Sequence, residues 1–92
     1  MRKEELSVLL EELNQTAELF YQEDLKTAYN KLIGIIPSIE DFISKIDDNH
    51  QEEIKEKLTV VLSALEEMDA TLLADTIKYE LVEYLQGIES DL

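Results

Sequence analysis

The chain has 92 residues, 45 % of them hydrophobic, and a formal net charge of −14 from 22 acidic and 8 basic side chains. This length fits one small domain over residues 1–92, and the hydrophobic content is too high for a disordered chain. Nucleic acids and anionic membranes are excluded as expected partners, because both are bound through Lys and Arg side chains.

The first predicted helix covers residues 3–22. Its apolar residues recur every three or four positions, as on one face of an α-helix. They are Leu6, Leu9, Leu10, Leu13, Ala17 and Phe20. The pattern loses its phase at Gln22, and Asp24 is of a type that caps helices. We therefore expect a turn here, with one continuous helix as far as Ile36 as the alternative.

The second predicted helix covers residues 24–46 and has the broadest apolar face. That face contains Leu25, Ala28, Leu32, Ile35, Ile36, Ile39, Phe42, Ile43 and Ile46. Pro37 lies inside it, where proline removes a backbone donor and clashes with the preceding turn. Because the periodicity continues in phase across Pro37, we expect a kink near Gly34 rather than two helices. We interpret this kink as a packing adjustment in preference to a ligand pocket.

The third predicted helix covers residues 50–68, after a loop in which Asp48 or Asn49 supplies the cap. Its apolar face contains Ile54, Leu58, Val61, Leu62, Leu65 and Met68. Its outer face is charged, and Glu53 and Lys57 have the spacing of a helical ion pair.

The fourth predicted helix covers residues 70–86, with Asp69 as its cap and Gly87 as its stop. Its core face contains Leu73, Ala74, Ile77, Leu81, Tyr84 and Leu85. Four amphipathic helices joined by short turns predict an all-α, up-down-up-down four-helix bundle. The apolar pattern of the first half reappears 45 residues later, which either a duplication or two hairpins of equal length would produce. A tetratricopeptide array would repeat after about 34 residues.

The residues that carry chemistry are few. The chain has no Cys, so disulfides and thiolate ligands are impossible. Its one histidine, His50, follows Asp47 by three residues, so a carboxylate-bridged di-metal site of the Glu-x-x-His type cannot be built. No acidic residue falls on a core face, and Asp75, the nearest candidate, is interpreted as a surface acid. We expect a non-enzymatic protein without cofactor or metal.

Protein–protein contact is the remaining class of function, because tyrosine is enriched at interfaces. Leu72, Asp75, Tyr79 and Val82 form a second side of the fourth helix, and Tyr29 and Ile33 form a similar pair on the second. These residues either border the core or form an interface. The interface would serve self-association or a groove for the amphipathic helix of a client protein.

The start of the chain, Met1-Arg2-Lys3, is not followed by the apolar region of a signal peptide. No apolar run approaches the roughly 18 residues of a membrane span. The sequence therefore predicts a cytoplasmic protein.

The stretch 69–85 resembles a signature of small uncharacterised helical proteins from low-GC Gram-positive bacteria, D-x-x-L-L-A-D-x-x-x-Y-E-L-x-P. The matching residues are Asp69, Leu72, Leu73, Ala74, Asp75, Tyr79, Glu80 and Leu81. Glu83 stands where those proteins often have proline. The resemblance implies a bacterial cytosolic helical protein without catalytic residues, and more distantly a small export chaperone connected with motility.

Overall fold

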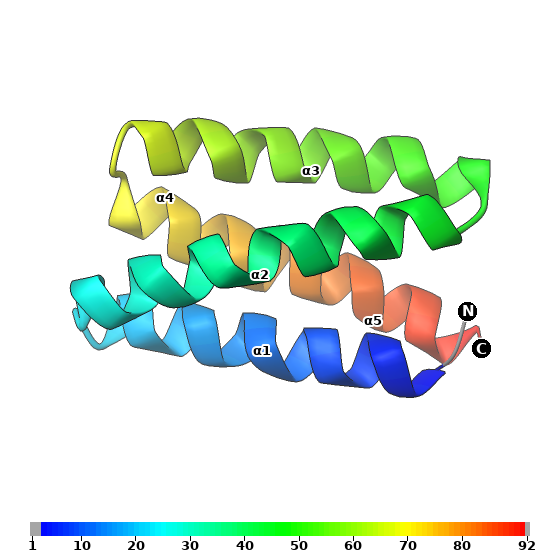
Figure 1. Cartoon of the computed structure of the whole chain (residues 1–92), viewed down its shortest axis with the longest axis horizontal. Helices are drawn as coiled ribbons and strands as arrows, with labels where there is room; N and C mark the ends of the chain where they lie inside the picture. Colours follow the sequence, from blue (N-terminus) through cyan, green and yellow to red (C-terminus); the bar gives the residue numbers. More distant parts are fainter. Residues whose placement is uncertain (1–2, 92) are drawn as a thin grey trace.

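The computed structural model describes residues 3–91 and forms a bundle of four helices (Figure 1). The first three are α1 (Lys3–Tyr21), α2 (Leu25–Lys45) and α3 (Asp48–Glu66). The fourth is made of three segments that follow one another without a gap: α4 (Ala70–Asp75), the π-helix η1 (Thr76–Val82) and α5 (Glu83–Ser90). The predicted all-α, up-down-up-down bundle is confirmed.

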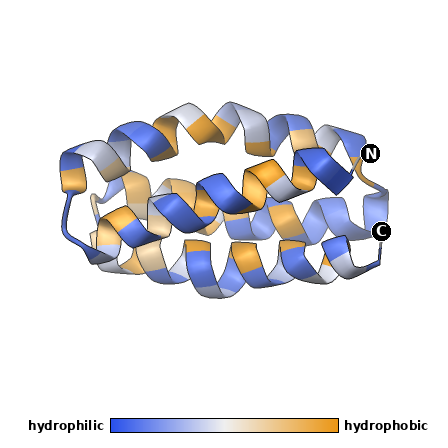
Figure 2. Ribbon diagram, turned by 90° about the horizontal axis from the view of Figure 1, so that it is seen from below, coloured by the Kyte–Doolittle hydropathy of each residue, from blue (hydrophilic) through white to orange (hydrophobic). Residues whose placement is uncertain are grey.

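The helices surround a single core made mainly of leucine, isoleucine and alanine side chains, with Phe20, Phe42, Val61 and Val82 among them. Helix α1 packs against both α2 and the whole fourth helix, whereas α2 and α3 contact each other less extensively. Hydrophobic and hydrophilic segments alternate along each ribbon in Figure 2, as expected of amphipathic helices. All six residues predicted for the core face of α1 are buried. None of the helices within residues 3–91 is long and apolar enough to cross a bilayer.

A tight turn separates α1 from α2, so the alternative of one continuous helix is wrong. Glu23 has a φ of 62°, in the left-handed region. The N–H of Glu23 donates to the Phe20 carbonyl at 3.1 Å, and the N–H of Asp24 donates to the Leu19 carbonyl at 3.0 Å. This pair of bonds is the Schellman motif, which satisfies the carbonyls left free at a helix end. Asp24 is at the cap position of α2, but its side chain makes no capping bond.

The turn between α3 and α4 has the same geometry. Met68 has a φ of 57°, its N–H donates to the Leu65 carbonyl, and the N–H of Asp69 donates to the Ala64 carbonyl. Asp69 caps the fourth helix as predicted, because its carboxylate accepts the N–H of Leu72 at 3.0 Å.

The two halves of the bundle have equal dimensions. Helices α1 and α3 each have 19 residues, and both begin and end 45 positions apart. The second helix of each hairpin spans 21 residues, over 25–45 and 70–90. The left-handed residues Glu23 and Met68 are also 45 positions apart. The sequence repeat therefore has a structural counterpart in two matching hairpins.

Several predicted helix boundaries are wrong. Helix α3 begins at Asp48 rather than at residue 50, and its cap is Asp47, whose carboxylate accepts the N–H of His50 at 3.4 Å. Gly87 is not a stop, since the fourth helix continues to Ser90. The expectation that Pro37 does not divide the second helix is confirmed, because α2 runs through it without a break. The kink expected near Gly34 stays a prediction.

Three residues predicted for the core are exposed: Leu25 by 41 %, Leu62 by 40 % and Met68 by 64 %. Leu25 is the first residue of α2 and Met68 lies in the turn between α3 and α4, so both are at the ends of helices. Leu62 is rotated by about 100° from Val61, the buried residue before it. Conversely, Thr16, Ala64 and Thr76 are buried, although the sequence analysis placed none of them on a core face.

The π-helical segment η1 changes which residues of the fourth helix face the core. In a regular α-helix of about 100° per residue, Val82 would lie on the side opposite to Leu73. Bonds from i to i+5 make a wider turn, so each residue advances by a smaller angle. Both Leu81 and Val82 consequently turn inwards and are 0 % and 4 % exposed. Of the two alternatives left open for Val82, the interface is therefore wrong, and Val82 belongs to the core.

We predict that Met68→Gly raises the free energy of unfolding by about 0.5–1 kcal/mol, because glycine adopts a positive φ without the steric cost of a Cβ. Chemical denaturation measures this change, and the melting temperature should rise by roughly 3–6 °C. Glu67→Gly is the matched control, because Glu67 has a φ of −85° and should lose stability. Equal effects of the two substitutions would contradict the argument.

We predict that Val82→Ala lowers the free energy of unfolding by about 2–3 kcal/mol, because two buried methyl groups are lost and a cavity remains. The same substitution at Val60, which is 43 % exposed on α3, should cost less than about 1 kcal/mol. Urea denaturation of both variants measures the difference. Val82 does not face the core if the two costs are equal.

Candidate functional site

The side of the fourth helix that was predicted as an interface is divided by the π-helix. Leu72 and Tyr79 remain on the surface, 40 % and 56 % exposed, and Asp75 between them is also exposed. Val82 does not lie on this side, because its side chain is buried in the core. The structure therefore brings three of the four predicted residues together.

Two residues that sequence reasoning did not assign to this surface complete it. The Tyr21 hydroxyl at the end of α1 donates a hydrogen bond of 2.7 Å to Oδ1 of Asp75. The ammonium group of Lys78 lies 5.6 Å from the centre of the Tyr21 ring and 5.9 Å from that of Tyr79, within the range of cation–π attraction. We call Tyr21, Leu72, Asp75, Lys78 and Tyr79 the aromatic surface.

The aromatic surface has unusual electrostatics at Tyr21. Burial raises the pKa of Tyr21, and the hydrogen bond to Asp75 and its negative charge raise it further, to about 12 from an ordinary value of 10.0. The protonated hydroxyl is therefore held in place as a donor at neutral pH. This contact ties the end of α1 to the fourth helix.

The remaining two predicted interface residues lie elsewhere. Tyr29 is half-buried, and its ring packs edge-on against Phe20 with the ring centres 5.0 Å apart. Ile33 is 57 % exposed. Both belong to α2, which packs chiefly against α1. They are consequently not part of the aromatic surface.

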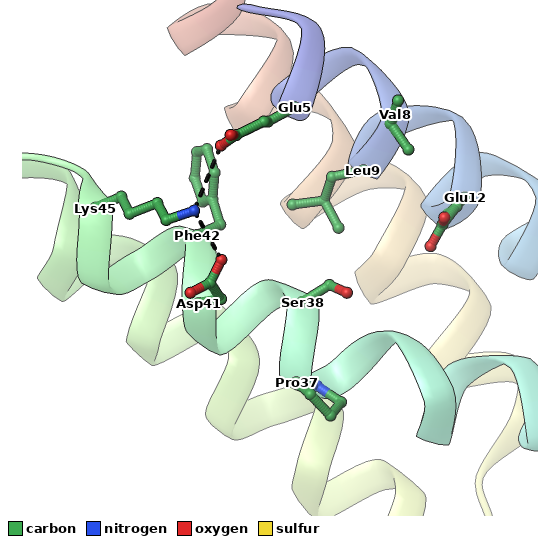
Figure 3. Close-up of a pocket in the computed structure, with 9 residues that line it drawn as sticks. All are labelled: Glu5, Val8, Leu9, Glu12, Pro37, Ser38, Asp41, Phe42 and Lys45. Atoms are coloured by element: carbon green, nitrogen blue, oxygen red, sulfur yellow. Dashed lines mark ion pairs between the residues drawn. The ribbon is translucent and has the colours of Figure 1, made fainter. Parts of the chain in front are cut away.

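A groove between α1 and α2 is lined by apolar side chains from both helices. It has a volume of about 510 Å³. The lining residues are Glu5, Val8, Leu9, Glu12, Pro37, Ser38, Asp41, Phe42 and Lys45 (Figure 3). Leu9 and Phe42 are 4 % exposed and form its floor, whereas Val8 is 55 % exposed at its edge.

One end of this groove is closed by an ion-pair bridge. The Lys45 ammonium lies 3.0 Å from Asp41 in the same helix and 3.6 Å from Glu5 in α1 (Figure 3). The hydrogen bond to Asp41 and the charges of both carboxylates raise the pKa of Lys45. Glu12, half-buried near the other end, makes no side-chain hydrogen bond or ion pair with any residue between positions 3 and 91.

A third polar group joins α3 to the fourth helix. His50 Nδ1 and the Tyr84 hydroxyl share a hydrogen bond of 2.8 Å. Lys57 forms the predicted pair with Glu53 and a second one with Glu80, both at 3.1 Å. Partial burial lowers the pKa of Lys57, but its two carboxylate partners outweigh this effect and leave it raised.

Within the described residues 3–91, no three His, Asp or Glu side chains are placed to hold a metal ion. No side-chain nitrogen or oxygen buried in this part of the chain lacks a hydrogen-bond partner. The polar groups near Tyr84 lie between α3 and the fourth helix and do not line the groove between α1 and α2.

The fold and these surfaces define a small, acidic four-helix protein. It belongs to the family described as "Domain of unknown function (DUF8042)", which matches residues 3–91. No curated protein and no solved structure matches the chain.

We predict that Asp75→Asn lowers the pKa of Tyr21 towards 10, because it removes the negative charge that opposes ionisation of the phenol. NMR titration of the tyrosine ring-carbon shifts measures this pKa. The control is Asp41→Asn, because Asp41 lies on α2 and makes no contact with Tyr21. Because the folded-state pKa is the higher one, Tyr21 stabilises the fold below pH 10, and this contribution disappears as the pH rises to about 12. An unchanged pKa in Asp75→Asn would refute the contact.

Proposed function

We propose that this protein is a non-enzymatic protein-interaction module. It binds its partner, another protein or a second copy of the chain, through the aromatic surface. The observation that carries this proposal is the position of Leu72 and Tyr79, two large side chains 40 % and 56 % exposed beside the Tyr21–Asp75 contact. Tyrosines held by neighbouring groups lose little conformational entropy on binding, which favours them as interface anchors.

The π-helix supports the proposal. Such segments are rare and often occur at functional sites. Here η1 includes Tyr79 and begins directly after Asp75. It keeps Tyr79 outside while it turns Val82 inside. The surface is therefore built on a rigid helix whose opposite side is anchored in the core.

We predict that a photoreactive amino acid at position 79 forms a specific covalent adduct with a partner protein in the native cell. The same label at Val60, an exposed residue of α3, should form none. Mass spectrometry of the adducts distinguishes a second copy of the chain from another protein. Light scattering of the purified chain independently measures whether it self-associates.

The matched variant is Leu72→Asp combined with Tyr79→Lys, which places unlike charges on the aromatic surface. Because Leu72 and Tyr79 are 40 % and 56 % exposed and lie outside the core, the melting temperature should change little. The complex found by cross-linking or light scattering should nevertheless be lost. A monomeric chain without an adduct at position 79, or a complex that survives the double variant, refutes the use of this surface.

A second candidate function is a small chaperone or regulator that clamps a helical segment of a client. The groove between α1 and α2 favours it, because an amphipathic helix binds by placing its apolar side in such a groove. The resemblance of residues 69–85 to small bacterial proteins supports a cytoplasmic location in a bacterium for either function. A client connected with motility or export belongs to this second candidate.

A further inference from the structure

We infer that the groove between α1 and α2 binds a basic amphipathic helix of a partner protein, with apolar anchors on its floor and a Lys or Arg at Glu12. This inference rests on the proposal that the chain is a protein-interaction module, but it does not depend on the aromatic surface. It names the chemistry of the partner from the side chains that line the groove.

The shape of the groove suits a helix. The lining residues run from Glu5 to Glu12 on α1 and from Pro37 to Lys45 on α2, roughly 10–12 Å or two helical turns at 1.5 Å per residue. Leu9 extends from α1 into the space between the helices in Figure 3. Together with Phe42 and the exposed Val8, it offers an apolar strip along which side chains at i, i+3 or i+4 and i+7 can pack.

The charge of the groove selects a basic partner. It is lined by the carboxylates of Glu5, Glu12 and Asp41 and by a single cation, Lys45. Lys45 neutralises the end formed by Glu5 and Asp41. Glu12 is two helical turns away from Glu5, half-buried and without a partner among residues 3–91. A carboxylate close to apolar side chains attracts a cation more strongly than one in bulk water.

The backbone of α2 adds an acceptor near the same groove. Because Pro37 has no N–H, the carbonyl of Ile33 lacks the donor that a regular helix provides. The net charge of the whole chain, −14, favours a basic protein as the partner over a second copy, because two copies with this charge repel each other.

The test uses three labelled synthetic peptides of about 14 residues and the full chain, with fluorescence anisotropy as the measurement. The first peptide is an amphipathic helix with Leu on one face and Lys on the other. The second replaces every Lys by Glu, and the third has the Leu and Lys residues scrambled so that no apolar face remains. We expect the first to bind at least about tenfold more tightly than either control at physiological salt, where diffuse charge attraction is screened.

Two pairs of variants locate the binding. Glu12→Lys and Glu56→Lys change the net charge equally, but Glu56 is exposed on α3, outside the groove. Val8→Lys and Val60→Lys place the same cation at two exposed valines of different helices. We expect Glu12→Lys and Val8→Lys each to lower the affinity for the first peptide by about tenfold. Glu56→Lys and Val60→Lys should leave this affinity unchanged. Circular dichroism verifies that all four variants are folded.

Equal affinity for the scrambled peptide, or equal losses in Glu12→Lys and Glu56→Lys, overturns the inference in favour of diffuse charge attraction. The inference is also overturned if Tyr79→Lys weakens binding of the first peptide and Val8→Lys does not. The peptide then binds the aromatic surface, and the proposed function stands. Peptide binding that depends on Val8 and Glu12, without an adduct at position 79, supports the inference and rejects the aromatic surface. Absence of binding by all three peptides overturns it as well.

Discussion

The structure depends on the packing of the fourth helix, which contacts both α1 and α3 along the core. The π-helical segment η1 shapes this packing, because its wider turn directs both Leu81 and Val82 inwards, where they are 0 % and 4 % exposed. Tyr79 belongs to the same segment and is 56 % exposed, as helical periodicity predicted. One short segment therefore contributes to both the core and the proposed interaction surface.

Charge governs the rest of the surface. With 22 acidic side chains against 8 basic ones, most carboxylates have no cation to pair with. Lys45 and Lys57 are the only cations in the ion pairs of the described residues. Lys45 joins α2 to α1 through Glu5, and Lys57 joins α3 to the fourth helix through Glu80. Exposed ion pairs contribute little to stability, so these lysines mainly align neighbouring helices. Glu12 differs from most of these unpaired carboxylates because it is half-buried, where it lines the groove between α1 and α2.

The two hairpins show which features of the fold can be predicted from local sequence patterns. Helical periodicity correctly predicted the core of α1 and most of α2, and Asp69 was correctly identified as a cap. The turns were placed within one or two residues, although neither Glu23 nor Met68 is the glycine that usually occupies a left-handed position. Gly87 looked like a stop but lies inside a helix. The predicted helix boundaries were wrong where the residue expected to form a turn is not the residue that forms it.

The sequence by itself determined the four amphipathic helices, their antiparallel order and the acidic outer surface, because these follow from residue spacing and charge. Only the tertiary structure decided that Val82 is buried, since that requires a helix geometry chosen by contacts with α1 and α3. It also decided that Tyr21 reaches Asp75, 54 residues further on, and that Val8 and Glu12 share a groove with Pro37. Such contacts join distant segments through packing, which no local pattern contains.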